Sequence, residues 1–187
     1  MSEPLRYEPA EVVVPAEAIA ERMQSLAQEI VAAYGHGAEG IVIVPVMTGA
    51  FVFAADLVRR MPNRLRVDVA TVRSYGSGTV SQGPRIEGVM PSVQGKHVLL
   101  IDDILDSGKT LAFLRNDMVQ RGAASVRACV LLRKKLPAAL ATPCEFIGFD
   151  IPDLFVAGYG LDCDGWFRNL PDVVSLRRIG EAVPVVR

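Results

Sequence analysis

The sequence predicts an α/β fold in which a mostly parallel central sheet is flanked by helices. Short apolar runs alternate with segments of helical period along most of the chain, which is the pattern of strand-helix-strand units. Two of these runs lead into turns at Gly49 and Gly108, and a helical pattern follows each turn. The chain has 187 residues, half of them apolar, which suits one hydrophobic core. We therefore expect a single domain over residues 1–187.

The spacing of apolar residues justifies the elements in chain order. A helical period over residues 16–34 predicts an amphipathic first helix that closes at Gly35 and Gly37. The apolar run 41–46 is short and fits a central strand. The further predicted elements are a helix over 51–58, strands at about 66–72, 98–101 and 126–132, and a helix that begins near residue 108. Ligands of such sheets bind at the carboxyl ends of the strands.

Residues 74–92 interrupt this alternation. They are rich in Ser, Gly, Pro and Gln and show no convincing period, so we expect a long mobile loop. Long loops inside compact domains are often lids or binding loops, and a plain connector is the alternative.

The most informative stretch is Val98 to Thr110. An apolar run delivers the adjacent acids Asp102 and Asp103 into a small polar turn, and a helical pattern follows. The amides of such a turn and the positive end of the helix dipole suit a phosphate. Two carboxylates at the end of a buried strand suit the diol of a sugar or a divalent metal.

Three other interpretations of this stretch compete with that one. Gly108-Lys109-Thr110 is similar to the end of an ATP- or GTP-binding P-loop, but Asp103 stands where the first glycine of that motif is required. The acids do not alternate as in an EF-hand. A charged surface turn remains the alternative.

Composition restricts the partners and the compartment. The formal net charge is -1, which argues against broad electrostatic binding of nucleic acid or anionic lipid. Residues 1–15 lack a secretory pattern, and no apolar run approaches membrane-spanning length. Cys129, Cys144 and Cys163 are widely spaced, which argues against a disulfide framework and a structural zinc site. We expect a cytoplasmic protein with a small ligand and with no nucleic-acid or membrane partner.

The stretch 98–110 resembles the PRPP-binding motif of the type I phosphoribosyltransferases, in the 6-oxopurine branch. Asp106 narrows the resemblance to the hypoxanthine-guanine members, although Asp102-Asp103 stands where Glu-Asp is usual. A second segment, residues 146–170, is similar to the base-binding region of the same branch.

The resemblance implies a fold, an activity and a cofactor. The fold would add a small hood, built from N-terminal residues and the segment of about 135–187, to the sheet. The reaction would move the 5-phosphoribosyl group of PRPP to N9 of hypoxanthine or guanine in purine salvage, with Mg²⁺ as cofactor and a dimer or tetramer as assembly. A xanthine-preferring transferase and a non-catalytic PRPP-sensing regulator are the alternatives.

The resemblance also implies roles for individual residues, in seven groups. Asp106 would be the general base. The 5-phosphate would be bound by Asp106, Ser107, Gly108, Lys109 and Thr110, and the ribose by Asp102 and Asp103. Mg²⁺ would be held by Asp102, Asp103 and Asp162. The pyrophosphate would contact Thr48, Gly49, Arg73 and Arg168, with Ser74 and Tyr75 in the lid. The purine would contact Ile104, Lys134, Phe155, Val156 and Asp162.

Three of these residues have simpler alternative roles. Asp106 would be an ordinary helix cap, Lys134 a solvated charge at a strand end, and Phe155 a core residue. The resemblance further implies a cis peptide bond between Met47 and Thr48, a feature that no residue pattern reveals.

Overall fold

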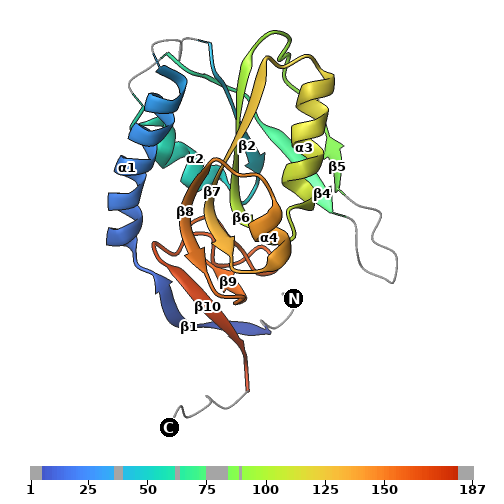
Figure 1. Cartoon of the computed structure of the whole chain (residues 1–187). Coiled ribbons are helices and arrows are strands. Elements are labelled where there is room, and N and C mark those ends of the chain that lie inside the picture. The colour runs from blue at the N-terminus through green and yellow to red at the C-terminus, as the bar shows by residue number, and fades with distance from the viewer. Residues whose placement is uncertain (1–5, 36–39, 62–63, 75–83, 89, 181–187) are drawn as a thin grey trace.

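A largely parallel sheet forms the centre of the molecule, with helices on both of its faces (Figure 1). The structure is a computed structural model and describes residues 6–35, 40–61, 64–74, 84–88 and 90–180. Within these ranges the strand order is β5-β4-β2-β6-β7-β8, and β3 also pairs with β2. Only β5 runs antiparallel to its neighbour among these described strands. The predicted fold class is confirmed.

The elements have the following bounds in chain order. They are β1 (Tyr7–Val14), α1 (Ala16–Tyr34), β2 (Val42–Met47), α2 (Phe51–Val58), β3 (Arg66–Val67), β4 (Ala70–Ser74), β5 (Pro84–Glu87), β6 (His97–Leu105), α3 (Lys109–Gln120), β7 (Ser125–Lys134), α4 (Pro137–Ala141), β8 (Phe146–Ile151), β9 (Val156–Ala157) and β10 (Val173–Arg178).

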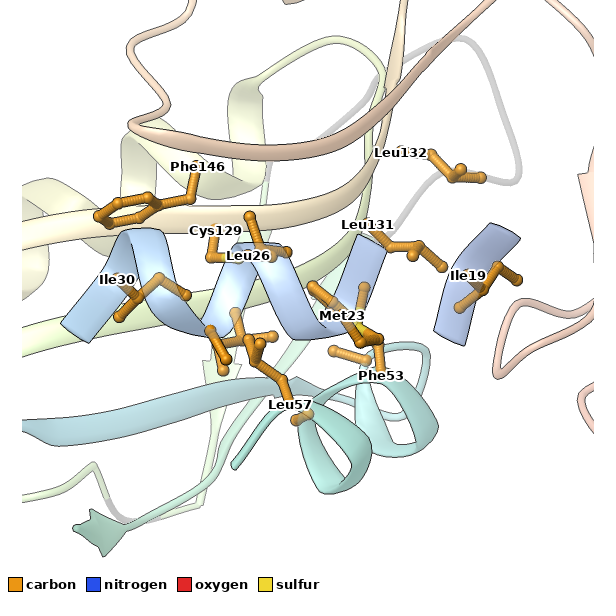
Figure 2. Close-up of a cluster of buried hydrophobic side chains, with 14 of the residues drawn as sticks. Ile19, Met23, Leu26, Ile30, Phe53, Leu57, Cys129, Leu131, Leu132 and Phe146 are labelled. Atoms are coloured by element: carbon orange, nitrogen blue, oxygen red, sulfur yellow. The ribbon is translucent and has the colours of Figure 1, made fainter. Parts of the chain in front are cut away.

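Alternate residues of the central strands pack into two separate cores. Strand side chains alternate between the faces of a sheet, so Leu99 and Ile101 of β6 meet α1 and α2, whereas Val98 and Leu100 meet α3. Figure 2 shows the first core, in which α1 lies against α2 and the sheet. Burial on both faces explains why the central strands are apolar throughout.

The first helix has the bounds that its period predicts, and Gly37 lies outside the described residues. Its N-terminal amide, Ala16 N, donates to the Asp172 carboxylate at 2.7 Å. It ends at Gly35, whose φ of +63° favours glycine and whose N–H donates to the Val31 carbonyl. The apolar period and Gly35 therefore act within the segment, whereas the first amide of the helix depends on a residue distant in the sequence.

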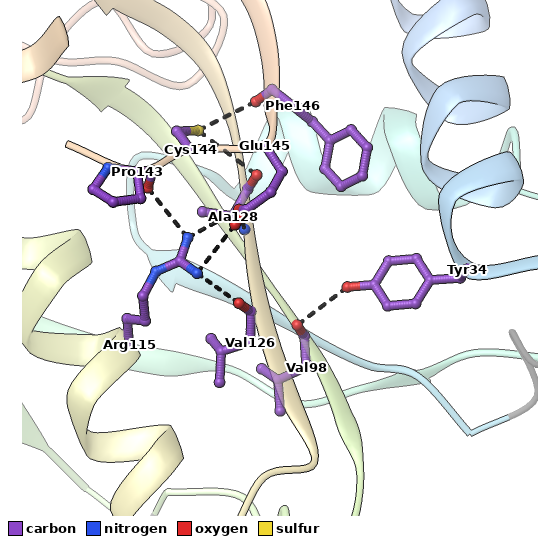
Figure 3. Close-up of polar contacts among 9 residues, drawn as sticks. All are labelled: Tyr34, Val98, Arg115, Val126, Ala128, Pro143, Cys144, Glu145 and Phe146. Carbon is purple, nitrogen blue, oxygen red and sulfur yellow. Dashed lines mark hydrogen bonds and ion pairs between the residues drawn. The ribbon is translucent and has the colours of Figure 1, made fainter. Parts of the chain in front are cut away.

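Two arginines donate hydrogen bonds to backbone carbonyl groups of β7 and β8. Arg22 of α1 donates to the Ile147 and Gly148 carbonyls at 2.7 and 3.1 Å. On the opposite side, Arg115 of α3 donates to the Val126 carbonyl and pairs with Glu145, which also accepts from Ala128 N (Figure 3). These contacts fasten α1 and α3 to the sheet beside the last strand.

A second, antiparallel sheet of order β1-β10-β9 joins the two ends of the described chain. In Figure 1 it lies below the central sheet, beside the carboxyl ends of β6 and β7. This sheet is the small hood that the resemblance implies. One boundary differs, because β8 within the segment 135–187 pairs with β7 and belongs to the central sheet.

Three other expectations need correction. The strand expected at about 66–72 is divided into β3 and β4, which lie in succession along the same edge of β2. The strand expected at 98–101 continues to Leu105, so the acidic pair lies inside it. The segment 74–92 contains β5, which pairs antiparallel with β4. Among the described residues, no helix is long and apolar enough to cross a membrane.

Candidate active site

A pocket of about 240 Å³ opens at the carboxyl ends of β6 and β7. Three segments far apart in the sequence contribute its walls. The lining residues are Asp103 and Ile104 in the last part of β6, Asp106 directly after it, Lys134 at the end of β7, and Leu154, Phe155, Val156, Leu161 and Asp162 from the chain around β9. Every residue predicted to contact the purine therefore lines one pocket.

Lys134 lies between two carboxylates at this pocket. Its Nζ is 2.8 Å from Asp153 Oδ1 and 3.3 Å from Asp106 Oδ2, and its side chain is only 12% exposed. Burial lowers the pKa of Lys134, but the hydrogen bonds to Asp153 and Asp106 outweigh it and the pKa is raised. Lys134 is thus a protonated pocket group, and the alternative of a solvated strand end is wrong.

Phe155 forms an open wall of the pocket. The side chain is 48% exposed, so the alternative of a core residue is wrong. The ring of Tyr7, on β1, packs edge to face against it with centroids 5.0 Å apart. The hood thereby fixes the ring while leaving an apolar surface free for a flat ligand.

The acidic pair is divided between pocket and interior. Asp103 lines the pocket, whereas Asp102 is 7% exposed. Burial and the adjacent charge of Asp103 raise the pKa of Asp102 well above its ordinary value, and burial raises the pKa of Asp103. The backbone N–H of Ile104 donates to Asp103 Oδ1 at 2.8 Å. A cation or hydroxyl groups beside this pair would relieve its electrostatic cost.

The loop after β2 packs directly on Asp103. The Met47–Thr48 peptide bond is cis, as the resemblance implies. A Cβ added to Gly49 would lie 1.8 Å from Asp103 Oδ2, and one added to Gly160 would lie 2.4 Å from the Gly49 carbonyl oxygen. Both positions require glycine, because the loop after β2 packs against the Asp103 carboxylate on one side and against the chain at Gly160 on the other.

Arg168 joins the same group. It donates to the Gly160 carbonyl at 2.6 Å and pairs with Asp162 Oδ1 at 2.7 Å. The other oxygen of Asp162 accepts from Gly165 N. Both oxygens of Asp162 are therefore engaged, and no cluster of three acidic, His or Cys side chains suited to a metal occurs among the described residues. The predicted role of Asp102, Asp103 and Asp162 as Mg²⁺ ligands therefore stays a prediction.

The turn before α3 presents its backbone without a side-chain cap. Gly108 has φ of +73° and stands at the N-cap, where no side chain accepts from the first amides. The alternative role of Asp106 as a helix cap is therefore wrong. Gly108 is buried against Thr142, whose Oγ1 would lie 2.0 Å from an added Cβ. Ser107 and Lys109 are exposed at the same turn.

Some predicted residues do not line this pocket, and two neighbours of the site were not predicted. Arg73 and Ser74 end β4, and Tyr75 lies outside the described residues, so their roles stay predictions. Asp153 and Thr142 were not predicted. Asp153 stands two residues before Phe155, inside the segment 146–170 that resembles the base-binding region, and this position is the signal that could have found it.

Comparisons with known proteins agree with this geometry. Residues 11–164 match the family model of the phosphoribosyl transferase domain. The chain is 37% identical over 171 residues to a hypoxanthine-guanine phosphoribosyltransferase of Aquifex aeolicus, covering 90% of this chain and 96% of the relative. It is 38% identical over 163 residues to the hypoxanthine phosphoribosyltransferase of Escherichia coli K12, covering 86% and 92%.

Solved structures give the same result. A crystal structure of a hypoxanthine phosphoribosyltransferase from Staphylococcus aureus superimposes with a TM-score of 0.83 at 32% identity, over 90% of this chain and 92% of that one. A ternary substrates complex of a mutant hypoxanthine phosphoribosyltransferase from Trypanosoma cruzi also gives 0.83, at 34% identity over 90% and 96%. The chain belongs to the phosphoribosyl transferase domain family and, within it, to the hypoxanthine-guanine phosphoribosyltransferases.

Proposed function

We propose that this chain transfers the 5-phosphoribosyl group of PRPP to N9 of hypoxanthine or guanine, releasing pyrophosphate and forming IMP or GMP. One observation carries the proposal beyond family membership. Asp106, Lys134 and Phe155, which come from three separate segments, line a single pocket beside Asp103 and the turn before α3. That arrangement offers a base site next to a sugar-phosphate site.

Base recognition would depend on three features of the pocket. The exposed face of Phe155 would stack on the purine, which is worth about 1–3 kcal/mol. The ammonium of Lys134 would donate to the 6-oxo oxygen, an acceptor that adenine lacks. The backbone at Val156 and Asp162 would contact the remaining edge of the base, with Ile104 on the opposite wall.

Asp106 would act as the general base. As N9 forms its bond to C1′, the bond between C1′ and the pyrophosphate oxygen breaks, and the N7 proton passes to the Asp106 carboxylate. The exposure of Asp106 at the pocket and the absence of a capping role support this assignment. Such proton transfer contributes roughly 10²–10⁴-fold in rate.

PRPP would bind along the carboxyl end of β6. The uncapped amides and hydroxyls from Asp106 through Ser107, Gly108, Lys109 and Thr110 would receive the 5-phosphate. The Asp103 carboxylate would accept hydrogen bonds from the ribose hydroxyls, and Asp102 would lie buried beside it. The oxygen donors of this pair suit Mg²⁺, which would neutralise charge on the pyrophosphate. Asp162, which pairs with Arg168, would contact Mg²⁺ directly or through a water, because its carboxylate oxygens can each accept more than one contact.

The leaving pyrophosphate would lie against the loop after β2. Thr48 is exposed there and Gly49 brings the backbone close to Asp103. Arg168, together with Arg73, would supply positive charge to the departing group. Ser74 and Tyr75 would begin the lid that excludes water from the reacting atoms.

Turnover with PRPP and Mg²⁺ on four purines tests the proposal. We expect activity with hypoxanthine or guanine and none with adenine. Preference for xanthine would support the xanthine-preferring alternative, and no turnover with any base, together with tight binding of RNA or DNA, would support the regulator.

Two further proposals concern assembly and location. We propose a homo-oligomer, a dimer or tetramer, which light scattering would test directly. We also propose a cytoplasmic location, because Cys129, Cys144 and Cys163 are all free thiols, the state that a reducing compartment maintains. Imaging of a tagged chain tests the location.

A further inference from the structure

We propose that Asp153 is a positioning residue for purine recognition, which holds the Lys134 ammonium where it meets the 6-oxo group. The inference rests on the proposed function and adds a residue to it. Asp153 Oδ1 is 2.8 Å from Lys134 Nζ, closer than Asp106 Oδ2 at 3.3 Å. Asp153 is therefore the main partner of this lysine.

The local backbone directs Asp153 to this place. Lys134 and Ile151 are paired at the ends of β7 and β8, and Lys135 N donates to the Ile151 carbonyl. The chain then turns at Pro152, where Leu154 N donates to the Pro152 carbonyl at 2.9 Å. The Asp153 carboxylate consequently returns to Lys134 across the end of the sheet.

The Asp153 carboxylate affects the role of Asp106 as the general base. A lysine ammonium has three donors, and two of them face Asp153 and Asp106, which leaves one for the base. If Asp153 were absent, the ammonium would pair with Asp106 alone. Asp106 must accept the N7 proton, so a tighter pair with Lys134 would occupy the general base and withdraw the ammonium from the 6-oxo group.

Asp153 also supports the charge of Lys134. The charged groups that face this ammonium are Asp106, on the turn after β6, and Asp153, on the turn after β8. Burial opposes the charge, and the hydrogen bond to Asp153 is the largest influence in its favour. Loss of the Asp153 charge would lower the pKa of Lys134, so the ammonium would be lost at a less alkaline pH.

Steady-state kinetics of Asp153→Asn test the proposal, with hypoxanthine and PRPP varied separately. We expect KM for hypoxanthine to rise roughly 10- to 100-fold, the equivalent of one lost charged hydrogen bond, and KM for PRPP to stay unchanged. The alkaline limb of kcat/KM for hypoxanthine should move to lower pH. Asp153→Glu should restore most of the affinity for the base.

Asp150→Asn is the matched control. Asp150 is an exposed carboxylate that pairs with Arg133, the neighbour of Lys134, at 2.7 Å, and it does not line the pocket. We expect this variant to keep both KM values and the pH profile of the wild type.

The outcomes separate this inference from the proposed function. Wild-type turnover with hypoxanthine tests the function itself. If the wild type is active and Asp153→Asn has the same KM and pH profile, the role of Asp153 is refuted while the function stands. An equal rise of both KM values would also refute it, because that pattern indicates general damage to the site.

Discussion

Replacing Gly49 by alanine should displace the Asp103 carboxylate without straining the backbone. The added Cβ would lie 1.8 Å from Oδ2 and 2.5 Å from Cγ of Asp103. Non-bonded carbon contacts have their optimum near 3.5 Å, so the carboxylate must move by about 1.5 Å. Gly49 does not have the positive φ that disfavours alanine, and the substitution is therefore a steric test of one contact.

The size of the effect follows from what Asp103 loses. Its Oδ1 accepts from Ile104 N at 2.8 Å, and a hydrogen bond to a charged group is worth about 1.5–3 kcal/mol. We expect Gly49→Ala to lower the free energy of unfolding by an amount in that range. KM for PRPP should rise about tenfold or more, since about 1.4 kcal/mol corresponds to a factor of ten.

A double-mutant cycle measured by urea unfolding checks the reasoning. The three atoms nearest to the added methyl group are Oδ2, Cγ and Oδ1 of Asp103, and Asp103→Ala removes all three. In that background Gly49→Ala should cost less than about 0.5 kcal/mol. The entropic effect of replacing glycine is common to both backgrounds and cancels. An equal cost in the two backgrounds would show that the clash is not with Asp103.

Four further predictions can be measured with purified protein. Asp106→Asn should lower kcat roughly 10²–10⁴-fold while calorimetric binding of PRPP is kept; unchanged kcat would remove its role as base. Phe155→Ala should raise KM for hypoxanthine about tenfold, from the loss of stacking, and Phe155→Tyr is the control that should retain it. EDTA should abolish turnover and added Mg²⁺ should restore it; activity that survives chelation would contradict the proposed cofactor. Burial of Glu145 opposes its charge, but hydrogen bonds from Arg115 and Ala128 lower its pKa below 4.5. The stabilisation is therefore complete above that pH and is lost as the pH falls through the lowered pKa, so wild type and Glu145→Gln should differ in unfolding free energy at neutral pH and converge in acid.

The spacing of apolar residues predicted a helix or strand correctly where that element has a clear apolar period within its own segment. Helix α1 has the predicted bounds because its apolar stripe and Gly35 act within the segment. Strand β5 has a single aliphatic residue, Ile86, and depends on pairing with β4, so no period revealed it. The hood strands likewise depend on partners distant in the sequence, and only the resemblance indicated them.

The candidate site was predictable as a set of residues but not as a set of contacts. The motif residues Asp106, Lys134 and Phe155 were identified from short segments, and the fold brings them to one pocket. The role of Asp102, Asp103 and Asp162 toward Mg²⁺ stays a prediction, because Asp162 pairs with Arg168 and no group of three such side chains lies together among the described residues. Asp153 lies in the predicted base-binding segment 146–170, but no role was predicted for it, because its contact is with a lysine nineteen residues earlier.

The closure of the hood has a consequence for biosynthesis. Glu11 and Ser175, which are 164 residues apart, bond to each other across β1 and β10. A nascent chain folds from its N-terminal part as it leaves the ribosome, so β1 must wait for its partner until β10 emerges. Until then Tyr7 has no sheet to hold it behind Phe155, and we expect an incomplete polypeptide to have a formed central sheet without a finished purine pocket.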